Sequence, residues 1–419
     1  MHRHHHARLS GREPVHFGLH ELVQPAHRAG GEVVMADTTM PHQRVDQPDL
    51  PPPASEVGII GWLYRNLFSS PLNIALTLVS LAIIYFVVPP FMDWAIFSAY
   101  WHEGTSRNDC LTPTGGLVDG AEQYAKTGAC WTMVRARFGQ FVYGFYPLDQ
   151  RWRVDLALIL QFAGIAALLI DRIPGKKYAA IFLFVVYPAL GYVLLFGGAG
   201  LAEVETRLWG GLFLNLILGS VGIVVSLPIG IVLALGRRSG MPVIRVASTV
   251  FIEFVRGVPL ISVLFMASVM LPLFLPEGVT FDKLMRAMIG IALFSAAYMA
   301  EVVRGGLQAI PKGQYEGAMA LGLNYGKMMG LIVLPQALRI VIPGIVNTFI
   351  GLFKATTLVT IIGLFDLLGV SQAASRDAEW QGLGKEGYVA TAIGFFIFCF
   401  AMARYSAYLE RKLQHGHKR

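Results

Sequence analysis

The sequence predicts an all-α polytopic membrane protein with about eight transmembrane helices. Hydrophobic residues make up 54% of the 419 residues and charged residues only 15%, a balance typical of membrane proteins. An apolar run of about 18 residues or more can cross the hydrocarbon core, about 30 Å thick, as a helix. Eight runs are long enough: 72–90, 155–171, 178–196, 211–235, 247–275, 286–304, 329–353 and 388–407.

The distribution of basic residues predicts the orientation of these spans. The net charge is +7, but the Lys and Arg residues are scattered in short clusters at the ends of apolar runs, which argues against a nucleic-acid surface. With eight spans, these clusters lie on one side, so both termini are predicted to be cytoplasmic. The clusters are Arg172/Lys176/Lys177, Arg237/Arg238/Arg245, Arg304/Lys312/Lys327 and Arg411/Lys412/Lys418/Arg419.

Residues 1–56 differ from the rest of the chain, because they hold eight of the eleven histidines and show no apolar periodicity. We expect a disordered cytoplasmic tail here. The run His2–His6 lacks a spacing that would fix metal geometry, so no metal site is predicted. Met35 is an alternative start. The sequence shows no cleavable signal peptide, so the first spanning helix is expected to direct insertion.

Three further regions follow the tail. Residues 57–205 carry three additional transmembrane helices and a large extracytoplasmic loop at about 91–153. Residues 206–410 form a compact unit of five spans, and residues 411–419 form a basic cytoplasmic tail. The boundary between the first two regions is expected near residue 205.

The large loop contains Cys110 and Cys130. In an oxidising compartment they can form a disulfide, for which chain entropy suggests a stabilisation of roughly 3 kcal/mol. The alternative is two unpaired thiols without a role. The third cysteine, Cys399, lies inside the last apolar run and is expected to be a small core residue.

The segment 305–328 separates two apolar runs and is expected on the cytoplasmic side. Glycines and Pro311 divide it into short pieces, and Gln314–Leu321 can form a helix of about two turns. Such a helix can lie in a groove of a partner protein, with Glu316 near its positive N-terminus. The alternative is an ordinary loop with no partner.

The stretch E-G-A-x3-G-x9-I-x-L-P resembles the E-A-A signature of permease subunits of bacterial ABC importers. In that family this loop is the coupling helix that docks on the ATPase. Gly317 stands where the family usually has Ala, and a Gly inside a helix costs roughly 1 kcal/mol relative to Ala. The residues that carry the signature are Glu316, Gly317, Ala318, Gly322, Ile332, Leu334 and Pro335.

Three further stretches, 253–260, 297–314 and 352–358, are similar to the polar amino-acid branch of these permeases. The additional N-terminal helices with their long loop resemble the second permease subunit of general L-amino-acid importers. The resemblance implies a type I ABC importer permease core in residues 206–410, with a cytoplasmic coupling loop at about 305–330.

The chain lacks a G-x4-G-K-[ST] phosphate loop, so we expect ATP and Mg²⁺ to be bound by a separate ATPase and no cofactor by this chain. The resemblance implies an inner-membrane subunit that moves L-amino acids by alternating access and is coupled to the ATPase through residues 311–328. Its expected partners are the ATPase, a second permease in a heterodimer and an extracytoplasmic amino-acid-binding protein. The alternative is a self-sufficient secondary transporter, which would need its own coupling-ion site. The sequence motifs indicate amino acids as a class and no particular amino acid.

Lys354 ends an apolar run beside Thr356 and Thr357. A charge at membrane depth is costly and often lines a transport pathway; alternatively, Lys354 reaches the outer interface. Asn347 and Ser295 complete the candidates for a substrate pathway, and the alternative for each is a hydrogen bond to a neighbouring helix.

Two pairs of opposite charges are spaced three residues apart on predicted helices. Glu253 and Arg256 are expected to form a structural ion pair, and Glu301 and Arg304 to brace the start of the coupling loop. The sequence shows no nucleophile with a base and no metal-ligand spacing, so catalysis by this chain is not expected.

Overall fold

The computed structural model describes residues 58–118, 121–170, 172–276 and 281–415. The predicted tail 1–56 and its histidine run lie outside the described residues, as does the end of the basic C-terminal tail. The chain divides into two compact units, Met1–Val79 and Ser80–Arg419, and the division falls inside helix α2 (Pro71–Met92).

The first unit contains helix α1 (Gly58–Leu67) and the beginning of α2. The turn between these helices is closed by Thr77, whose hydroxyl donates to the Leu67 carbonyl at 3.0 Å. Trp62 on α1 is 59% exposed, as suits an aromatic side chain at a membrane interface.

Seven helical segments of the described residues are long and apolar enough to cross a membrane, or eight if one bent pair counts as a single span. This agrees with the predicted all-α membrane fold. The spanning elements after α2 are α5 (Arg151–Leu169), α6 to α7 (Lys176–Ile181 and Tyr187–Phe196), α8 (Gly211–Arg237), α9 (Pro242–Gly257) with α10 (Leu260–Phe265), α11 (Lys283–Ala309), α15 (Ile342–Ala355) and α17 (Gly384–His415).

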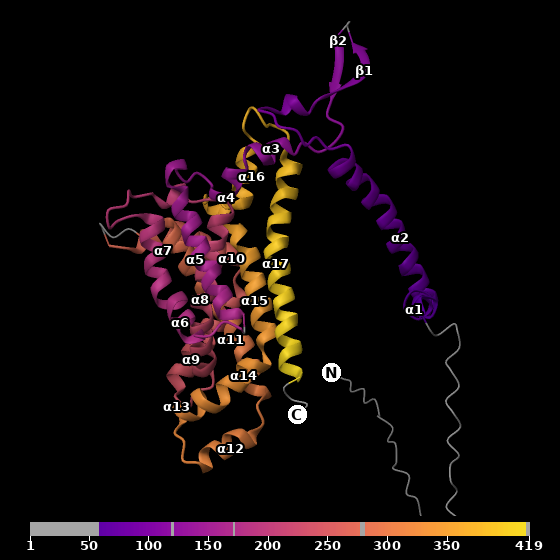
Figure 1. Cartoon of the computed structure of the whole chain (residues 1–419). Coiled ribbons are helices and arrows are strands. Elements are labelled where there is room, and N and C mark those ends of the chain that lie inside the picture. Colours follow the sequence, from indigo (N-terminus) through magenta and orange to yellow (C-terminus); the bar gives the residue numbers. More distant parts are fainter. Residues whose placement is uncertain (1–57, 119–120, 171, 277–280, 416–419) are drawn as a thin grey trace, which may run out of the picture. The chain divides into compact units, whose positions relative to one another are not determined.

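Helices α8 and α11 pack together through the second unit (Figure 1). Their close approach depends on small residues, since a Cβ added at Gly230 would lie 2.7 Å from Met299 Cβ. Phe213 and Leu218 of α8 and Ile291 of α11 are almost fully buried. Lipid tails are as apolar as these side chains, so close van der Waals packing rather than the exclusion of water holds the two helices together, and these helices form the centre of the fold.

The two ends of the second unit carry different structures. One end carries the segment 93–147, here called the hairpin module, and the other carries the short helix α12 (Lys312–Ala320) (Figure 1). The hairpin module contains antiparallel strands β1 and β2, paired from Thr112 with Ala125 to Val118 with Ala121. Its elements are β1 (Thr112–Val118), β2 (Ala121–Ala125), α3 (Thr132–Ala136) and α4 (Phe138–Tyr143).

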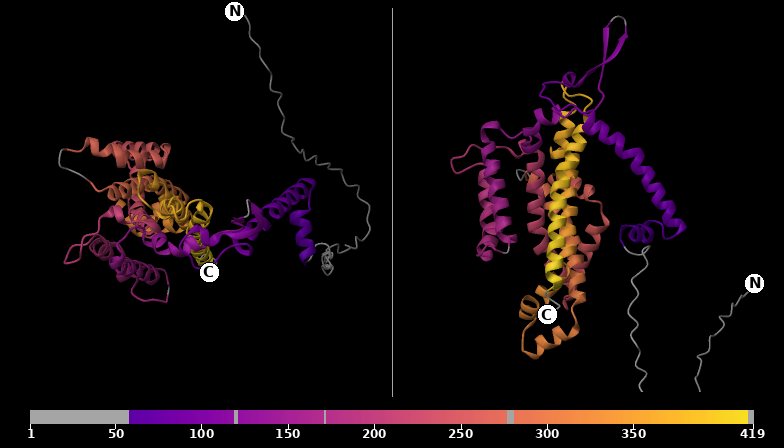
Figure 2. Two further views of the ribbon diagram at one scale, coloured as in Figure 1. Left: turned by 90° about the horizontal axis from the view of Figure 1, so that it is seen from above. Right: turned by 45° about the vertical axis from the view of Figure 1, so that its right-hand side comes forward.

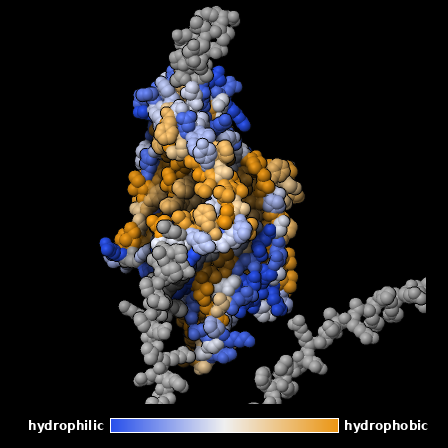
Figure 3. Space-filling model, turned by 90° about the vertical axis from the view of Figure 1, so that its right-hand side faces the viewer, coloured by the Kyte–Doolittle hydropathy of each residue, from blue (hydrophilic) through white to orange (hydrophobic). Residues whose placement is uncertain are grey.

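The hairpin module packs against the end of the five-span region that lies opposite α12 (Figure 1), and residues 80–205 and 206–410 belong to one compact unit. The hydrophobic cluster at this contact joins Met133 and Phe141 to Trp380 and Leu383. The division between the two compact units falls between Val79 and Ser80, and residue 205 lies inside the second unit. On the face drawn in Figure 3, hydrophobic residues gather in a middle zone, with hydrophilic residues above it.

Two predicted spans differ from the observed helices. The run 247–275 is two helices, α9 and α10, bent by 104° at Val258 and Pro259, because both residues are extended and Pro259 cannot continue the first helix. The run 329–353 contains α14 (Leu334–Ile340) and a break at Val341, so the spanning segment is Ile342–Ile362 instead.

Candidate functional site

Helix α12 is the short helix that the sequence predicted in the cytoplasmic segment. It runs from Lys312 to Ala320, and its C-terminus is closed by Gly322, which has φ +71°. The Gly322 and Leu323 amides donate to the Met319 and Ala318 carbonyls at 2.9 and 3.2 Å. Glycine adopts this left-handed conformation without a Cβ penalty, which explains the residue type at this position.

Three side chains hold α12 against the rest of the protein. Ala318 is 2% exposed, and the Tyr315 hydroxyl donates to the Leu307 carbonyl of α11 at 3.2 Å. The guanidinium of Arg238, the residue that follows α8, lies over the Tyr315 ring at 5.9 Å from the ring centroid. These contacts connect α12 to the ends of α8 and α11.

The surface around α12 is exposed and partly apolar. Met319, Leu321 and Tyr325 are 58%, 78% and 58% exposed, and Glu316 and Gly317 are exposed beside them. The helix ends at Ala320, so Leu321 lies just beyond it, and both Met319 and Leu321 are open to the surroundings. The remaining signature residues lie on the return path, Ile332 in the π-helical turn Met329–Val333 and Leu334 and Pro335 at the start of α14.

Glu301 of α11 lies at the centre of a cluster of arginines on the same side of the protein. Its carboxylate accepts from Arg237 of α8 at 2.6 Å and from Arg304 at 2.7 Å, and Arg256 of α9 lies 3.7 Å away. The carboxylate is only 16% exposed. This cluster, here called the Glu301 cluster, joins three helices near α12.

The pair expected between Glu253 and Arg256 has different partners. Glu253 accepts from Arg237 at 2.7 Å, whereas Arg256 faces Glu301 on α11. The spacing of Glu253 and Arg256 along one helix did not indicate their partners, because those partners, Arg237 and Glu301, lie on other helices. The sequence treated Arg237 only as an orientation signal.

The candidates for a substrate pathway do not form one group. Thr356 and Ser295 are buried, at 0% and 5% exposure, whereas Asn347 and Lys354 are exposed on α15. The Thr357 hydroxyl donates to the Lys354 carbonyl at 3.0 Å. Of the five candidates, only Asn347 and Lys354 therefore present open polar side chains.

Thr356 belongs to a buried hydrogen-bond network that the sequence did not identify. The Asn215 side-chain amide of α8 donates to the Thr356 hydroxyl at 2.8 Å and to Asp366 at 3.2 Å. Its oxygen accepts from the Leu367 amide at 2.9 Å. Burial raises the pKa of the Asp366 carboxyl, and hydrogen bonds from Thr360 and the Gly369 amide oppose this shift. A polar residue inside an apolar run was the available signal for Asn215.

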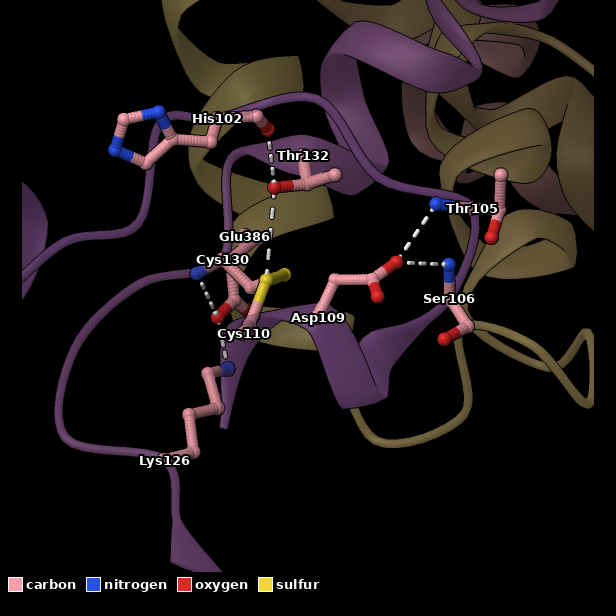
Figure 4. The surroundings of a disulfide bond; sticks show 9 residues. All are labelled: His102, Thr105, Ser106, Asp109, Cys110, Lys126, Cys130, Thr132 and Glu386. Atoms are coloured by element: carbon pink, nitrogen blue, oxygen red, sulfur yellow. Dashed lines mark hydrogen bonds and ion pairs between the residues drawn. A yellow bond between two sulfur atoms is a disulfide. The ribbon is translucent and has the colours of Figure 1, made fainter. Parts of the chain in front are cut away.

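The hairpin module is closed by a disulfide between Cys110 and Cys130, whose Cα atoms are 5.7 Å apart (Figure 4). Glu386, at the start of α17, is completely buried. It accepts from the Cys130 amide at 3.1 Å and pairs with Lys126. Both partners lie within the ring that the disulfide closes, and Glu386 was not identified from the sequence.

Comparison with known proteins identifies the chain's relatives. Residues 226–415 match the family described as binding-protein-dependent transport system inner membrane component. The chain is 52% identical over 357 residues to the inner membrane amino-acid ABC transporter permease protein YhdY of Escherichia coli, covering 85% of this chain and 93% of that relative. It is 41% identical to the glutamate/glutamine/aspartate/asparagine transport system permease protein BztC of Rhodobacter capsulatus, covering 92% of this chain and 100% of that relative.

A solved structure described as an amino acid ABC transporter with histidines is 27% identical, covers 48% of this chain and 92% of its own, and has a TM-score of 0.43. The family consists of transport components without a catalytic domain, in complexes that also contain an ATPase and a binding protein. The chain belongs to this family, as a multi-pass inner-membrane permease subunit of a binding-protein-dependent amino-acid ABC importer.

Proposed function

We propose that α12 and the following turn dock on the ATPase and couple its motion to the membrane helices. The observation that carries this proposal is the exposed surface formed by Met319, Leu321 and Tyr325 on a helix that is itself anchored. An anchored helix transmits force, and exposed apolar residues rimmed by polar ones favour a protein contact. In this proposal Gly322 fixes the shape of the docking surface.

The Glu301 cluster supports the proposed transmission. It joins α8, α9 and α11 close to where Tyr315 contacts the ends of α8 and α11. A rigid connection allows the ATPase to bias the permease between two arrangements, which is what alternating access requires. Glu301 and Arg304 would then brace the coupling loop.

We also infer that the partner permease is a different chain and that the substrates are polar L-amino acids. The additional helices and hairpin module in residues 57–205 favour a specialised partner. The relative BztC is named for glutamate, glutamine, aspartate and asparagine, which supports polar substrates here.

Both termini are proposed to be cytoplasmic. The end of α17 lies at the same end of the second unit as α12 (Figure 2), and α12 is proposed to face the ATPase. In this proposal α9 and α10 together form one span, and the resulting even number of spans supports a cytoplasmic N-terminus as well. The hairpin module is then extracytoplasmic, where its disulfide is favoured.

The coupling proposal is tested with Gly322→Leu in vesicles that contain the permease pair, the ATPase and the binding protein. Since Leu is strained at φ +71°, we expect ATP-driven amino-acid uptake to fall about tenfold or more while the membrane complex still assembles. Gly240→Leu is the control, because Gly240 has open space and no positive φ. Undiminished uptake by Gly322→Leu would contradict the proposal.

A further inference from the structure

One face of α15 is polar and open at membrane depth. Asn347, Gly351 and Lys354 are four and three residues apart, which places them on the same side of a helix. All three are exposed, and a Cβ added at Gly351 would meet nothing within 4 Å. We call these residues the α15 stripe.

Lys354 lies near the middle of its span. The spanning segment runs from Ile342 to Ile362, and the ring of the adjacent Phe353 lies 5.3 Å from the ring of Phe395, in the middle of the α17 span. The eight residues from Lys354 to Ile362 rise about 12 Å or more, which exceeds the length of a lysine side chain. The end of the span therefore lies farther from Lys354 than its side chain can extend.

A lysine at this depth needs a compensating group or water. Charged residues inside a membrane face a protein interior or an aqueous path and pair with opposite charges. Among the described residues, no ion pair involves Lys354. Contact with lipid is thus unfavourable, and an anion from outside this chain is the expected partner.

We propose that the α15 stripe lines the substrate path and that the Lys354 ammonium binds the carboxylate common to all amino acids. This inference rests on the proposed import of amino acids and adds the role of one residue. Gly351 leaves room beside the helix, and the Asn347 amide offers a second polar contact. A carboxylate of the second permease is the competing partner.

Thiol accessibility tests the location of the stripe independently of uptake. In a Cys399→Ser background, Lys354→Cys in the complex with ATPase and binding protein is treated with a negatively charged methanethiosulfonate. We expect labelling, and we expect a mixture of L-amino acids to slow it about fivefold or more. The control Ile397→Cys, on an apolar part of α17 that is 57% exposed, should stay unlabelled.

The two labelling outcomes separate the alternatives. If the thiol of the Lys354→Cys variant stays unlabelled, the stripe lies against lipid or a packed subunit, and the proposal is overturned. Labelling that amino acids leave unchanged would overturn it as well.

Uptake supplies a second measurement. Lys354→Met should raise the KM for every transported amino acid about tenfold or more, and Lys354→Arg should restore part of the loss. Lys385→Met, which removes an exposed lysine, is the charge control. If wild-type uptake does not require the ATPase, the proposed function fails while the labelling result still stands.

Discussion

The Arg237 guanidinium of α8 donates to the Glu301 carboxylate of α11 at 2.6 Å and to Glu253 of α9 at 2.7 Å. One arginine therefore connects three helices on the side of the protein that carries α12. Glu301 is the more buried acid, at 16% exposure against 54% for Glu253, so the two contacts should differ in energy.

Glu301→Gln should lower the free energy of unfolding more than Glu253→Gln does. Removing the Glu301 charge leaves several arginines without their central counter-charge, for which about 1–3 kcal/mol is expected. Glu253 is exposed, so its pair should contribute about 1 kcal/mol or less. Thermal unfolding of the purified complex in detergent measures both; equal losses would show that burial does not distinguish the two carboxylates.

The disulfide and Glu386 should depend on each other. Replacing Cys110 and Cys130 by Ser should cost roughly 3 kcal/mol for a ring of this size, and it should release the Lys126 and Cys130 contacts to Glu386. Glu386→Gln should therefore destabilise the wild-type protein more than it destabilises the variant without the disulfide. A double-mutant cycle on thermal unfolding checks this, and strictly additive effects would contradict the dependence.

Asn215→Ala should destabilise the protein in a pH-dependent way. Because the folded-state pKa of Asp366 is raised by burial, its contribution to stability is fully present below the unfolded pKa and is lost as pH rises through the folded pKa. Loss of the Asn215 donor should disfavour the charged carboxylate further. We expect a loss of about 1–3 kcal/mol, larger at about pH 8 than at about pH 4; a larger loss at low pH would contradict this sign.

Gly306→Ala should destabilise the packing of α11 against α14, whereas Gly305→Ala should not. A Cβ at Gly306 would lie 2.6 Å from the Ala337 carbonyl oxygen, but one at Gly305 would meet nothing within 4 Å. We expect a cost of about 1–3 kcal/mol at Gly306 and a gain of up to about 1 kcal/mol at Gly305 from helix propensity. Thermal unfolding of the two variants tests the difference.

Much of the fold could be predicted because apolar run length determines which segments can span a membrane. The bend of 104° between α9 and α10 could not be predicted by that measure. The apolar run is unbroken through Val258 and Pro259, and the hydropathy of a run does not indicate the direction in which the chain continues. The start of the span at Ile342 was missed for a similar reason, because the apolar run begins before the break at Val341.

The short helix α12 was predictable because Gly and Pro mark its ends locally. The partners of Glu386 and Glu301 were not, since they come from distant parts of the chain. Lys126 and Glu386 are 260 residues apart, and a single sequence does not indicate which distant charges meet. Asn215 and Asp366 are 151 residues apart, and their hydrogen bond forms only because α8 packs against the segment that follows α15.

The contact between Cys130 and Glu386 joins residues 256 apart in the chain, which has a consequence for biosynthesis. At about 5–20 residues per second, the ribosome needs about 13 to 50 s to make the intervening chain. The hairpin module cannot complete its contacts until the last spanning helix has been made. A chain truncated before α17 would lack Glu386, so the Cys130 amide and Lys126 would lose this partner.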